Sequence, residues 1–364
     1  MLLYWGRRGP ITDLALSLAR AASESRNQQV TISISRQNES LDAFAKIDGR
    51  LFPVATFASG LGAVTSAWRI PGLRRSLARY IREQQIESVV TLMPHIWGPF
   101  IAPVVRYAGA QYATIVHDAD AHPGDATGLV TRWLLRDAEE ADPVITLSRN
   151  VRSRLVAAHP RLAPRIETLF HPDLDFNGPT HMPAPKPGEP FRLLFLGRIL
   201  PYKGLPLLVE AVERLREEGL TIQLGVHGEG PIGPLHARLV ALNAEVRNRW
   251  LTRAEIAETL SRYHAVALSH VEASQSGVAM AALGGGLPVV ATPVGGLPEQ
   301  IEPGVTGVLA EAATPEAFAA ALKKLALDLD SYARMRTAIV SLRAERSPAR
   351  FLAELTAILA RTRR

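Results

Sequence analysis

The stretch FRLLFLGRILPYKGLPLLVEAV, residues 191–212, contains a short apolar run, a loop with two glycines and a helical pattern, in that order. The run 191–197 is rich in Leu and Phe and ends at a glycine, which predicts a buried strand. A strand that leads into a helix is the building unit of a parallel sheet covered by helices. Ligands of such sheets bind beyond the carboxyl ends of the strands, where the loop 197–204 lies.

Similar apolar runs occur on both sides of this stretch and alternate with helical patterns such as 13–24 and 74–83. We therefore predict an α/β fold with two doubly wound Rossmann-like domains that face a central cleft. The further predicted strands are LLYW (2–5), VTISIS (30–35), SVVTLM (88–93), YATIVH (112–117), PVITLS (143–148), TIQLGVHG (221–228), AVALS (265–269) and LPVVAT (287–292).

The segment NGPTHMPAPKPGEP, residues 177–190, is dense in Pro and Gly and has no periodicity, which predicts a linker. A length of 364 residues favours two domains of similar size. We expect one domain over 1–176 and a second over 191–346. We also expect the last helical pattern, 347–364, to cross back to the first domain.

The composition excludes several classes of protein. The chain has no cysteine, which excludes a disulfide framework, a thiolate zinc site and a cysteine nucleophile. We find neither a signal-peptide pattern nor an apolar stretch long enough to span a bilayer, so we expect a cytoplasmic protein. The net charge is +6, with the basic excess concentrated in residues 1–170, which suits an anionic partner.

Two loops contain side chains suited to a diphosphate. Arg198 and Lys203 follow the strand 191–197, where a guanidinium and an ammonium could both reach phosphate oxygens. Ser276 and Gly277 stand where a helix begins, and free backbone N–H groups there favour anions. Glu272 would repel phosphate but could accept hydrogen bonds from sugar hydroxyls. The structural alternatives are a loop with solvated cations, and a helix start capped by Glu272 and Ser274.

His117 ends the predicted strand 112–117 and could donate a hydrogen bond to a sugar. A structural histidine is the alternative, and His95 and His171 have the same ambiguity. Gly228, Gly230, Gly295 and Gly296 would allow close approach of the backbone to a ligand.

In this order the motifs resemble glycosyltransferase family 4, the retaining enzymes of the GT-B fold. The resemblance covers the second domain well and the end of the first domain moderately. The matching segments are ADPVITLSRNVRSRL (141–155), LGRILPYKGLPLLVEAV (196–212), GEGP (228–231), SHVEASQSG (269–277) and GGGLPVVATPVGGLPEQIEPGVTGVL (284–309).

The resemblance implies an acceptor-binding first domain and a second domain that binds the nucleotide-sugar donor. It implies that Arg198 and Lys203 neutralise the donor diphosphate and that Ser276, Gly277 and Val278 bind the distal phosphate through the backbone. The donor sugar would contact His117, Glu272 and Ser274, and the catalytic residues would be His117, Arg198, Lys203 and Glu272. The nucleotide would lie against Gly228, Arg249, Trp250 and Leu251, with Arg253 nearby.

One departure from the family pattern concerns the ribose. The family usually has a second glutamate, at the position of Met280 or Ala281 in this chain, and neither residue is acidic. Ribose recognition must therefore differ, and the donor nucleotide stays open.

The resemblance implies transfer of a hexose-type sugar to a glycan or lipid-linked acceptor in bacterial polysaccharide or glycoconjugate synthesis. It implies front-face substitution, and no metal or cofactor is expected. A sugar-nucleotide epimerase or hydrolase of the same fold and a non-catalytic sugar-binding relative are the alternatives. A dehydrogenase would need G-x-G-x-x-G where the chain has Gly6-Arg-Arg-Gly9-Pro10. No nucleic-acid partner is expected, since no recognisable module is present.

Residues 68–82 combine an apolar stripe with five arginines and predict peripheral contact with an anionic membrane, on the inner face of the cytoplasmic membrane. The stripe consists of Ile70, Leu73, Leu77 and Tyr80/Ile81. A helix that packs on a sheet has the same pattern, and this alternative stays open for the stripe.

Overall fold

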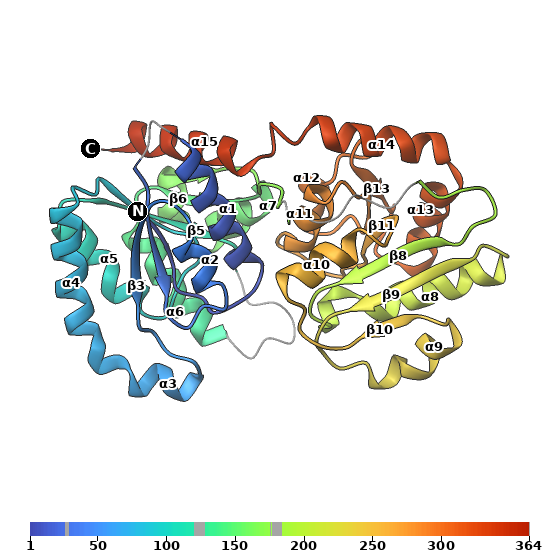
Figure 1. Cartoon of the computed structure of the whole chain (residues 1–364), viewed down its shortest axis with the longest axis horizontal. Helices are drawn as coiled ribbons and strands as arrows, with labels where there is room; N and C mark the ends of the chain where they lie inside the picture. The colour runs from blue at the N-terminus through green and yellow to red at the C-terminus, as the bar shows by residue number, and fades with distance from the viewer. Residues whose placement is uncertain (26–28, 120–127, 175, 177–183, 364) are drawn as a thin grey trace. The chain divides into compact units, whose positions relative to one another are not determined.

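The computed structural model describes residues 1–25, 29–119, 128–174, 176 and 184–363. These residues form two compact units (Figure 1). The first unit comprises the residues up to Phe170 together with those from Pro348 onward, and the second comprises His171–Ser347. Of the predicted linker 177–190, residues 177–183 lie outside the described residues, and 184–190 contain neither helix nor strand.

The first unit is built on a parallel sheet of seven strands in the order β3-β2-β1-β4-β5-β6-β7. The chain adds strands on one side of β1 and then moves to the other side, so the topological switch point lies between β1 and β4. The strands are β1 (Leu2–Tyr4), β2 (Thr31–Ser35), β3 (Arg50–Val54), β4 (Ser88–Thr91), β5 (Gln111–Val116), β6 (Val144–Thr146) and β7 (Ile166–Thr168).

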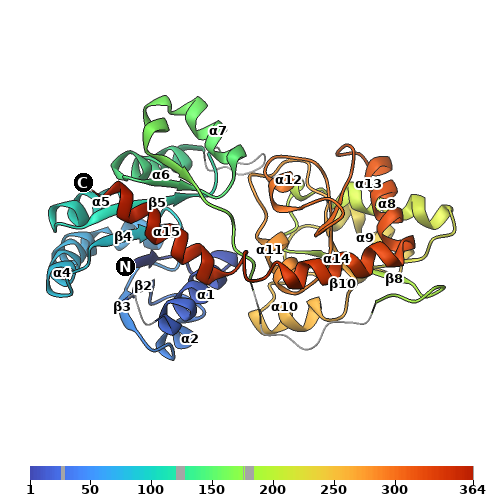
Figure 2. The same ribbon diagram turned by 90° about the horizontal axis from the view of Figure 1, so that it is seen from above.

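Helices cover this sheet in two groups. Helix α4 packs against α5 and α5 against α6, whereas α1 contacts α2 and α15, as Figures 1 and 2 show for α15 beside α1. The helices are α1 (Pro10–Glu24), α2 (Leu41–Ala45), α3 (Gly60–Thr65), α4 (Ile70–Glu83), α5 (Gly98–Tyr107), α6 (Gly128–Glu140), α7 (Arg149–Ala158) and α15 (Pro348–Thr362), with the 3-10 turns η1 (Ala67–Arg69) and η2 (Pro160–Arg165).

The second unit repeats the topology with a six-stranded parallel sheet in the order β10-β9-β8-β11-β12-β13. Its switch point lies between β8 and β11. The strands are β8 (Phe191–Leu196), β9 (Ile222–His227), β10 (Glu245–Arg247), β11 (Ala265–Leu268), β12 (Val289–Ala291) and β13 (Gly307–Leu309). The helices are α8 (Leu205–Glu217), α9 (His236–Ala241), α10 (Arg253–Leu260), α11 (Gly277–Gly284), α12 (Leu297–Gln300), α13 (Pro315–Leu327) and α14 (Leu329–Ser341), with the 3-10 turns η3 (Pro201–Lys203) and η4 (Gly233–Leu235).

Helix α8 shows why the sequence forms these layers. Its apolar residues Leu205, Leu208, Val209 and Val212 are all buried, at the spacing that the sequence predicts for one helical face. They pack with α13 and the central strands into the main core of the second unit. Burial of each such side chain contributes about 1.5–3 kcal/mol to folding.

The α/β fold with two doubly wound Rossmann-like sheets is confirmed. All nine predicted strands are present, and four strands that the sequence did not predict, β3, β7, β10 and β13, form the edges of the two sheets. Helix α15 packs within the first unit. Among the described residues, no helix combines the length and the apolar character needed to cross a membrane.

Candidate functional site

The candidate site lies at the carboxyl edge of the second sheet, at its switch point. The loop 197–204 follows β8 and the loop 269–276 follows β11, and these two strands are neighbours in the sheet. Such an edge is the usual position of ligands in doubly wound sheets. The sequence places Arg198 and Lys203 on the first loop, and Glu272, Ser274 and Ser276 on the second.

Hydrogen bonds fasten these two loops to one another. The backbone N–H of Val271 donates to the Tyr202 carbonyl at 2.9 Å, and the Ser269 hydroxyl donates to the Lys203 carbonyl at 3.1 Å. Gly204 has a φ of +67°, and a Cβ there would overlap the Ser269 carbonyl oxygen. Only glycine therefore permits this approach, which holds the backbones of the two loops in contact.

The two cations of the first loop have different surroundings. The Lys203 ammonium lies 2.9 Å from Nε2 of His270 and 5.4 Å from the centre of the Tyr202 ring. Because an ammonium can only donate, Nε2 accepts and the buried imidazole is neutral with its proton on Nδ1. Arg198 is exposed and forms no hydrogen bond or ion pair with any other described residue.

Helix α11 begins directly beside this loop. A Cβ on Gly197 would lie 3.3 Å from a methyl of Val278, in the first turn of α11. The first N–H groups of a helix have no partner within it, so Gly277 and Val278 can present theirs to an anion. The Ser276 hydroxyl is buried and has no hydrogen-bond partner among the residues that the structure describes.

The backbone of Ser276 is not free for phosphate, contrary to the role implied by the resemblance. Its N–H donates to Oε1 of Gln300 at 2.6 Å, and Nε2 of Gln300 donates back to the Ser276 carbonyl at 3.2 Å. Both residues are buried. Gln300 therefore fixes the start of α11, a role that our sequence analysis did not assign.

The residues expected to bind the nucleotide have mixed surroundings. Gly228 follows β9, and a Cβ there would overlap the Gly197 carbonyl, so the loops after β8 and β9 are in contact. Arg249 pairs with Glu255, whose pKa is lowered to about 2 chiefly by this hydrogen bond. Trp250 is half-buried, whereas the Leu251 side chain packs in the core. Leu251 could thus serve a ligand only through its backbone.

His117 belongs to the first unit, at the end of β5. Its Nε2 lies 2.7 Å from the Leu92 carbonyl, and burial lowers the pKa of the ring. A carbonyl only accepts, so Nε2 carries the proton and Nδ1 of the neutral ring can accept but not donate. The hydrogen bond that we predicted His117 would donate to a sugar is therefore donated to the Leu92 carbonyl instead.

Of the two other candidate histidines, His95 is half-buried and His171 is buried. His95 packs against Trp5, Trp97 and Phe57, and burial lowers its pKa to about 4. His171 is 5% exposed. This packing makes His95 a structural residue.

Met280 and Ala281 stand where the family has its second glutamate, and both are buried. The Met280 carbonyl accepts a hydrogen bond from the Leu174 N–H at 3.1 Å. These side chains are part of the core and cannot contact a ribose. Within the described ranges, no three His, Asp or Glu side chains are grouped as metal ligands.

Comparisons with known proteins relate this chain to glycosyltransferases. Residues 190–328 match the family model of the glycosyl transferases group 1. The D-inositol 3-phosphate glycosyltransferase of Corynebacterium glutamicum is 35% identical over 152 residues, which cover 39% of this chain and 36% of that protein. The aligned part thus spans about a third of that relative's length.

A longer alignment is with the GDP-mannose-dependent alpha-(1-6)-phosphatidylinositol monomannoside mannosyltransferase of Mycolicibacterium smegmatis. It is 29% identical over 293 residues, and the alignment covers 71% of this chain and 72% of that protein.

Among solved structures, HepE of Anabaena in complex with UDP and glucose superposes with a TM-score of 0.72. The identity is 16%, and the match covers 98% of this chain and 99% of that one. A glycosyltransferase from Rickettsia africae gives the same TM-score at 14% identity, covering 99% and 97% of the two chains. The chain has the GT-B fold.

Proposed function

We propose that this chain is a retaining glycosyltransferase of family 4, which transfers a hexose-type sugar from a nucleoside diphosphate sugar to a glycan or lipid-linked acceptor. The observation that carries the proposal is the contact between the loops 197–204 and 269–276, at the switch point of the second sheet. The loop that contains Arg198 and Lys203 contacts the start of α11, where the N–H groups of Gly277 and Val278 have no partner within the helix. The similarity to glycosyltransferases that use nucleotide sugars supports it.

The proposed chemistry follows from the charge that develops on the leaving group. As the bond between sugar and phosphate breaks, the leaving nucleoside diphosphate gains negative charge. In this proposal Arg198, Lys203 and the start of α11 stabilise that charge with groups that are already present at the site, so little reorganisation is required. No metal or cofactor is needed for this step. The leaving phosphate itself would assist removal of the acceptor proton, in a front-face substitution.

Contacts with the donor sugar are proposed for Glu272 and Ser274, because both lie on the loop beside this phosphate position. Glu272 is half-buried and Ser274 is buried. His117 could take part only as an acceptor while its ring is neutral. Nucleotide contacts are proposed for Gly228, Trp250 and the backbone of Leu251, and the ribose must be bound without a carboxylate at Met280.

A panel of UDP-, GDP- and ADP-sugars tests this proposal. A donor should raise the unfolding temperature, because it binds only the folded state, and should release nucleoside diphosphate when an acceptor is present. Equal release without any acceptor would instead favour a hydrolase or epimerase of the same fold. If no donor is bound, the glycosyltransferase proposal fails and a non-catalytic relative is favoured.

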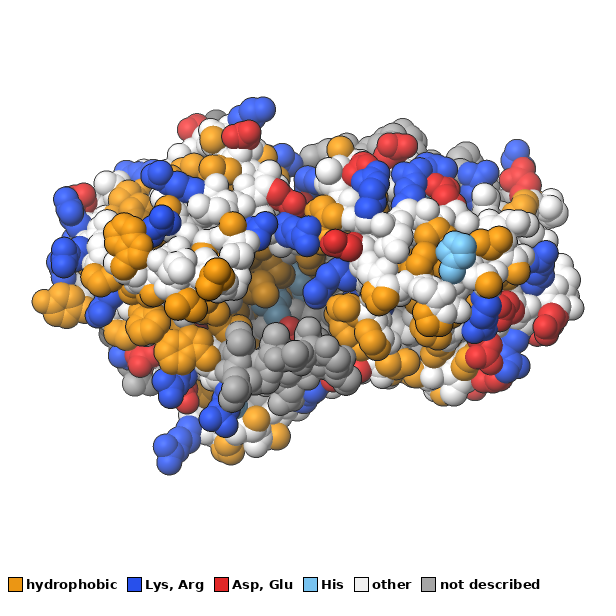
Figure 3. All heavy atoms as spheres, turned by 90° about the horizontal axis from the view of Figure 1, so that it is seen from below, with side chains coloured by type: hydrophobic (Ala, Val, Ile, Leu, Met, Phe, Trp, Pro, Cys, Tyr) orange, Lys and Arg blue, Asp and Glu red, His pale blue; other side chains and the backbone are white. Residues whose placement is uncertain are grey.

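We also propose that the acceptor lies at an anionic membrane surface, on the cytoplasmic side. One similar protein is a phosphatidylinositol monomannoside mannosyltransferase by name. The apolar stripe of 68–82 does not support this, because Ile70, Leu77 and Ile81 are buried in the core. The exposed arginines and Trp68 do support it, and Figure 3 shows hydrophobic and basic side chains gathered on this face.

Flotation with anionic vesicles tests the membrane proposal. We expect the protein to float at low salt and to dissociate at high salt, because each cation near the surface contributes about 1 kcal/mol. Changing Arg74, Arg79 and Arg82 to Gln should abolish flotation. The matched control changes Arg216, Lys324 and Arg334 of the second unit to Gln, which removes the same charge. Absence of flotation at low salt would contradict the proposal.

A further inference from the structure

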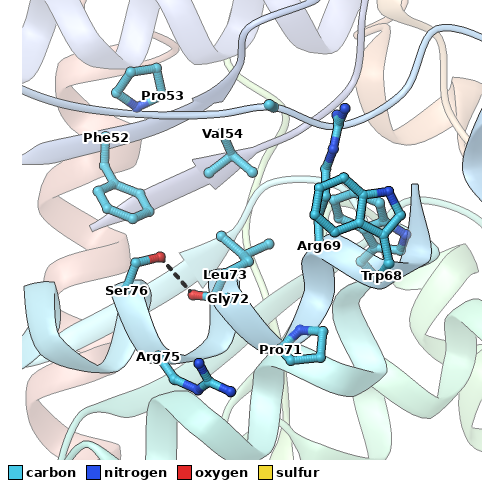
Figure 4. A pocket seen from close by; sticks show the side chains of 12 residues that line it. Phe52, Pro53, Val54, Trp68, Arg69, Pro71, Gly72, Leu73, Arg75 and Ser76 are labelled. Carbon is cyan, nitrogen blue, oxygen red and sulfur yellow. Dashed lines mark hydrogen bonds between the residues drawn. The ribbon is translucent and has the colours of Figure 1, made fainter.

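A pocket of about 500 Å³ lies in the first unit, between the end of β3 and the segment η1–α4. Its volume is within the range of small-molecule sites, about 300–1,000 Å³. Figure 4 shows Phe52 and Val54 of β3 pointing toward Leu73 and Ser76 of α4. Trp97, at the start of α5, lines the pocket as well. Most of the wall is therefore apolar, as for a site that holds hydrocarbon.

Arginines surround this apolar space. Arg69 and Arg75 line the pocket, and Arg74, Arg79 and Arg82 lie exposed on the same helical segment. Residues 67–82 contain no acidic side chain. An apolar cavity bordered by uncompensated cations is complementary to an amphiphile with a hydrocarbon chain and an anionic head.

Exposed hydrophobic side chains extend the apolar surface outward from the pocket. Trp68 lines it and is 75% exposed, and Leu61 and Val64 of the adjoining α3 are 77% and 76% exposed. Single exposed hydrophobic residues are ordinary, but a group of three beside an apolar cavity marks an interaction site. The group provides a path for a lipid chain from a bilayer to the pocket.

One residue of the pocket wall is a glycine and therefore has no side chain. Gly72 lines the pocket, and a Cβ built on it meets no atom within 4 Å. Here the glycine leaves space on the pocket side of α4 that a larger residue would fill.

We propose that this pocket binds one hydrocarbon chain of an anionic phospholipid, with the head group held by Arg69 and Arg75. The proposal deepens the proposed function, since such a lipid would be the acceptor or its carrier. Lipid binding itself requires neither donor nor turnover. It can therefore be tested separately from transferase activity.

The probe is a short-chain lysophosphatidylglycerol, titrated calorimetrically below its micellar concentration. Two comparison compounds separate the contributions. Lysophosphatidylcholine of the same chain has no net charge, and glycerophosphoglycerol has the anionic head without the chain. We expect the lysophosphatidylglycerol to bind at least about tenfold more tightly than either. Equal binding of either comparison compound would overturn the proposal.

Two variants that fill the pocket test its location. Gly72→Phe and Ser76→Phe stand one helical turn apart, and each should weaken binding of lysophosphatidylglycerol at least about tenfold. The paired change Arg69→Gln with Arg75→Gln should do the same. The matched control is Arg152→Gln with Arg161→Gln, which removes equal charge from exposed positions of α7 and η2 in the same unit, away from the pocket, and should retain binding.

Each variant is first shown to be folded by its thermal unfolding transition, and two filling variants are used in case one fails to fold. Unchanged lipid binding in a folded filling variant would overturn the pocket assignment. The donor-induced thermal shift is measured in parallel. If the unmodified protein shows the donor shift but does not bind the lipid, only this inference is contradicted. If the unmodified protein shows no donor shift, the proposed function is contradicted.

Discussion

Arg198 and Lys203 belong to one loop but contribute charge in different ways. Lys203 is half-buried between His270 and Tyr202, so its ammonium is held in position before any ligand arrives. Arg198 is exposed and keeps all its donors for a ligand. A guanidinium can form paired hydrogen bonds to phosphate, and an ammonium acts as a compact charge. The two residues are thus complementary parts of a diphosphate site.

Removing either cation should lower turnover while the fold survives. We expect Arg198→Ala and Lys203→Ala each to reduce kcat by about a hundredfold, the effect of losing one donor to the transition state. The measurement is release of nucleoside diphosphate at saturating donor. Lys324→Ala, at an exposed position on α13, is the control and should be fully active. Near-normal turnover of both variants would remove the assignment.

Gln300 is a positioning residue for the start of α11. Its amide donates to the Ser276 carbonyl and accepts from the Ser276 N–H, which a carboxylate cannot do because it only accepts. Gln300→Glu should therefore displace the helix start and add negative charge near the proposed phosphate. We expect the donor KM to rise about tenfold or more, with a smaller effect on kcat.

The same substitution at Gln223, on the exposed side of β9, is the matched control and should leave KM unchanged. Rescue of the donor KM at a pH where the introduced carboxyl group is protonated would be consistent with the role, since a carboxylic acid can donate. An unchanged donor KM in the Gln300→Glu variant would contradict it.

The limits of sequence reasoning at this scale are visible at Ser276 and His117. The position of Arg198 and Lys203 at the edge of the sheet could be predicted, because a loop after a strand has a known place in a parallel sheet. The contact between Gln300 and Ser276 joins residues on separate elements, and nothing in either local sequence indicates it. The Leu92 carbonyl that holds His117 lies on the neighbouring strand's loop, so the sequence alone could not show which ring nitrogen is engaged.

At the scale of elements, central strands could be predicted and edge strands could not. The predicted strands are apolar because helices cover both of their faces. β3 and β10 are edge strands with charged residues and partial exposure, and β3 contains Pro53, which edge positions tolerate. β7 contains Glu167 and β13 begins at Gly307, so neither strand lies in a long apolar run. Their place is set by pairing with β6 and β12.

Substitution of Gly204 tests the contact between the loops 197–204 and 269–276. Gly204→Ala adds both the cost of a left-handed backbone, about 1–2 kcal/mol, and a clash with the Ser269 carbonyl. Gly219→Ala is the matched control, because its φ is +83° but its Cβ would meet no atom within 4 Å. We expect Gly204→Ala to lower the free energy of unfolding by at least about 2 kcal/mol more than the control, in urea titrations. Equal losses would show that the loops can separate at little cost.

At the scale of the whole molecule, the two ends of the chain contribute to one unit. Residues from Pro348 onward belong to the first unit although they follow the second in sequence. Phe351, Leu352, Leu355 and Ile358 of α15 are buried, at the spacing of one helical face. Ion pairs of Arg361 with Glu167 and of Arg363 with Glu87 add to this packing. The first unit therefore completes its core only after the entire second unit has been synthesised.

Leu355→Ala should consequently destabilise the first unit from a position far along the chain. Truncation of a buried leucine to alanine costs about 2–5 kcal/mol. Tryptophan fluorescence reports on this unit, because Trp5, Trp68, Trp97 and Trp133 belong to it and only Trp250 belongs to the other. We expect the fluorescence-detected unfolding midpoint in urea to fall markedly. Arg361→Ala, which removes only an exposed ion pair of the same helix, should cost less than about 1 kcal/mol. If Leu355→Ala unfolds at the same urea concentration as the unmodified protein, α15 is not part of the cooperative core, and the first unit can form without the last helix.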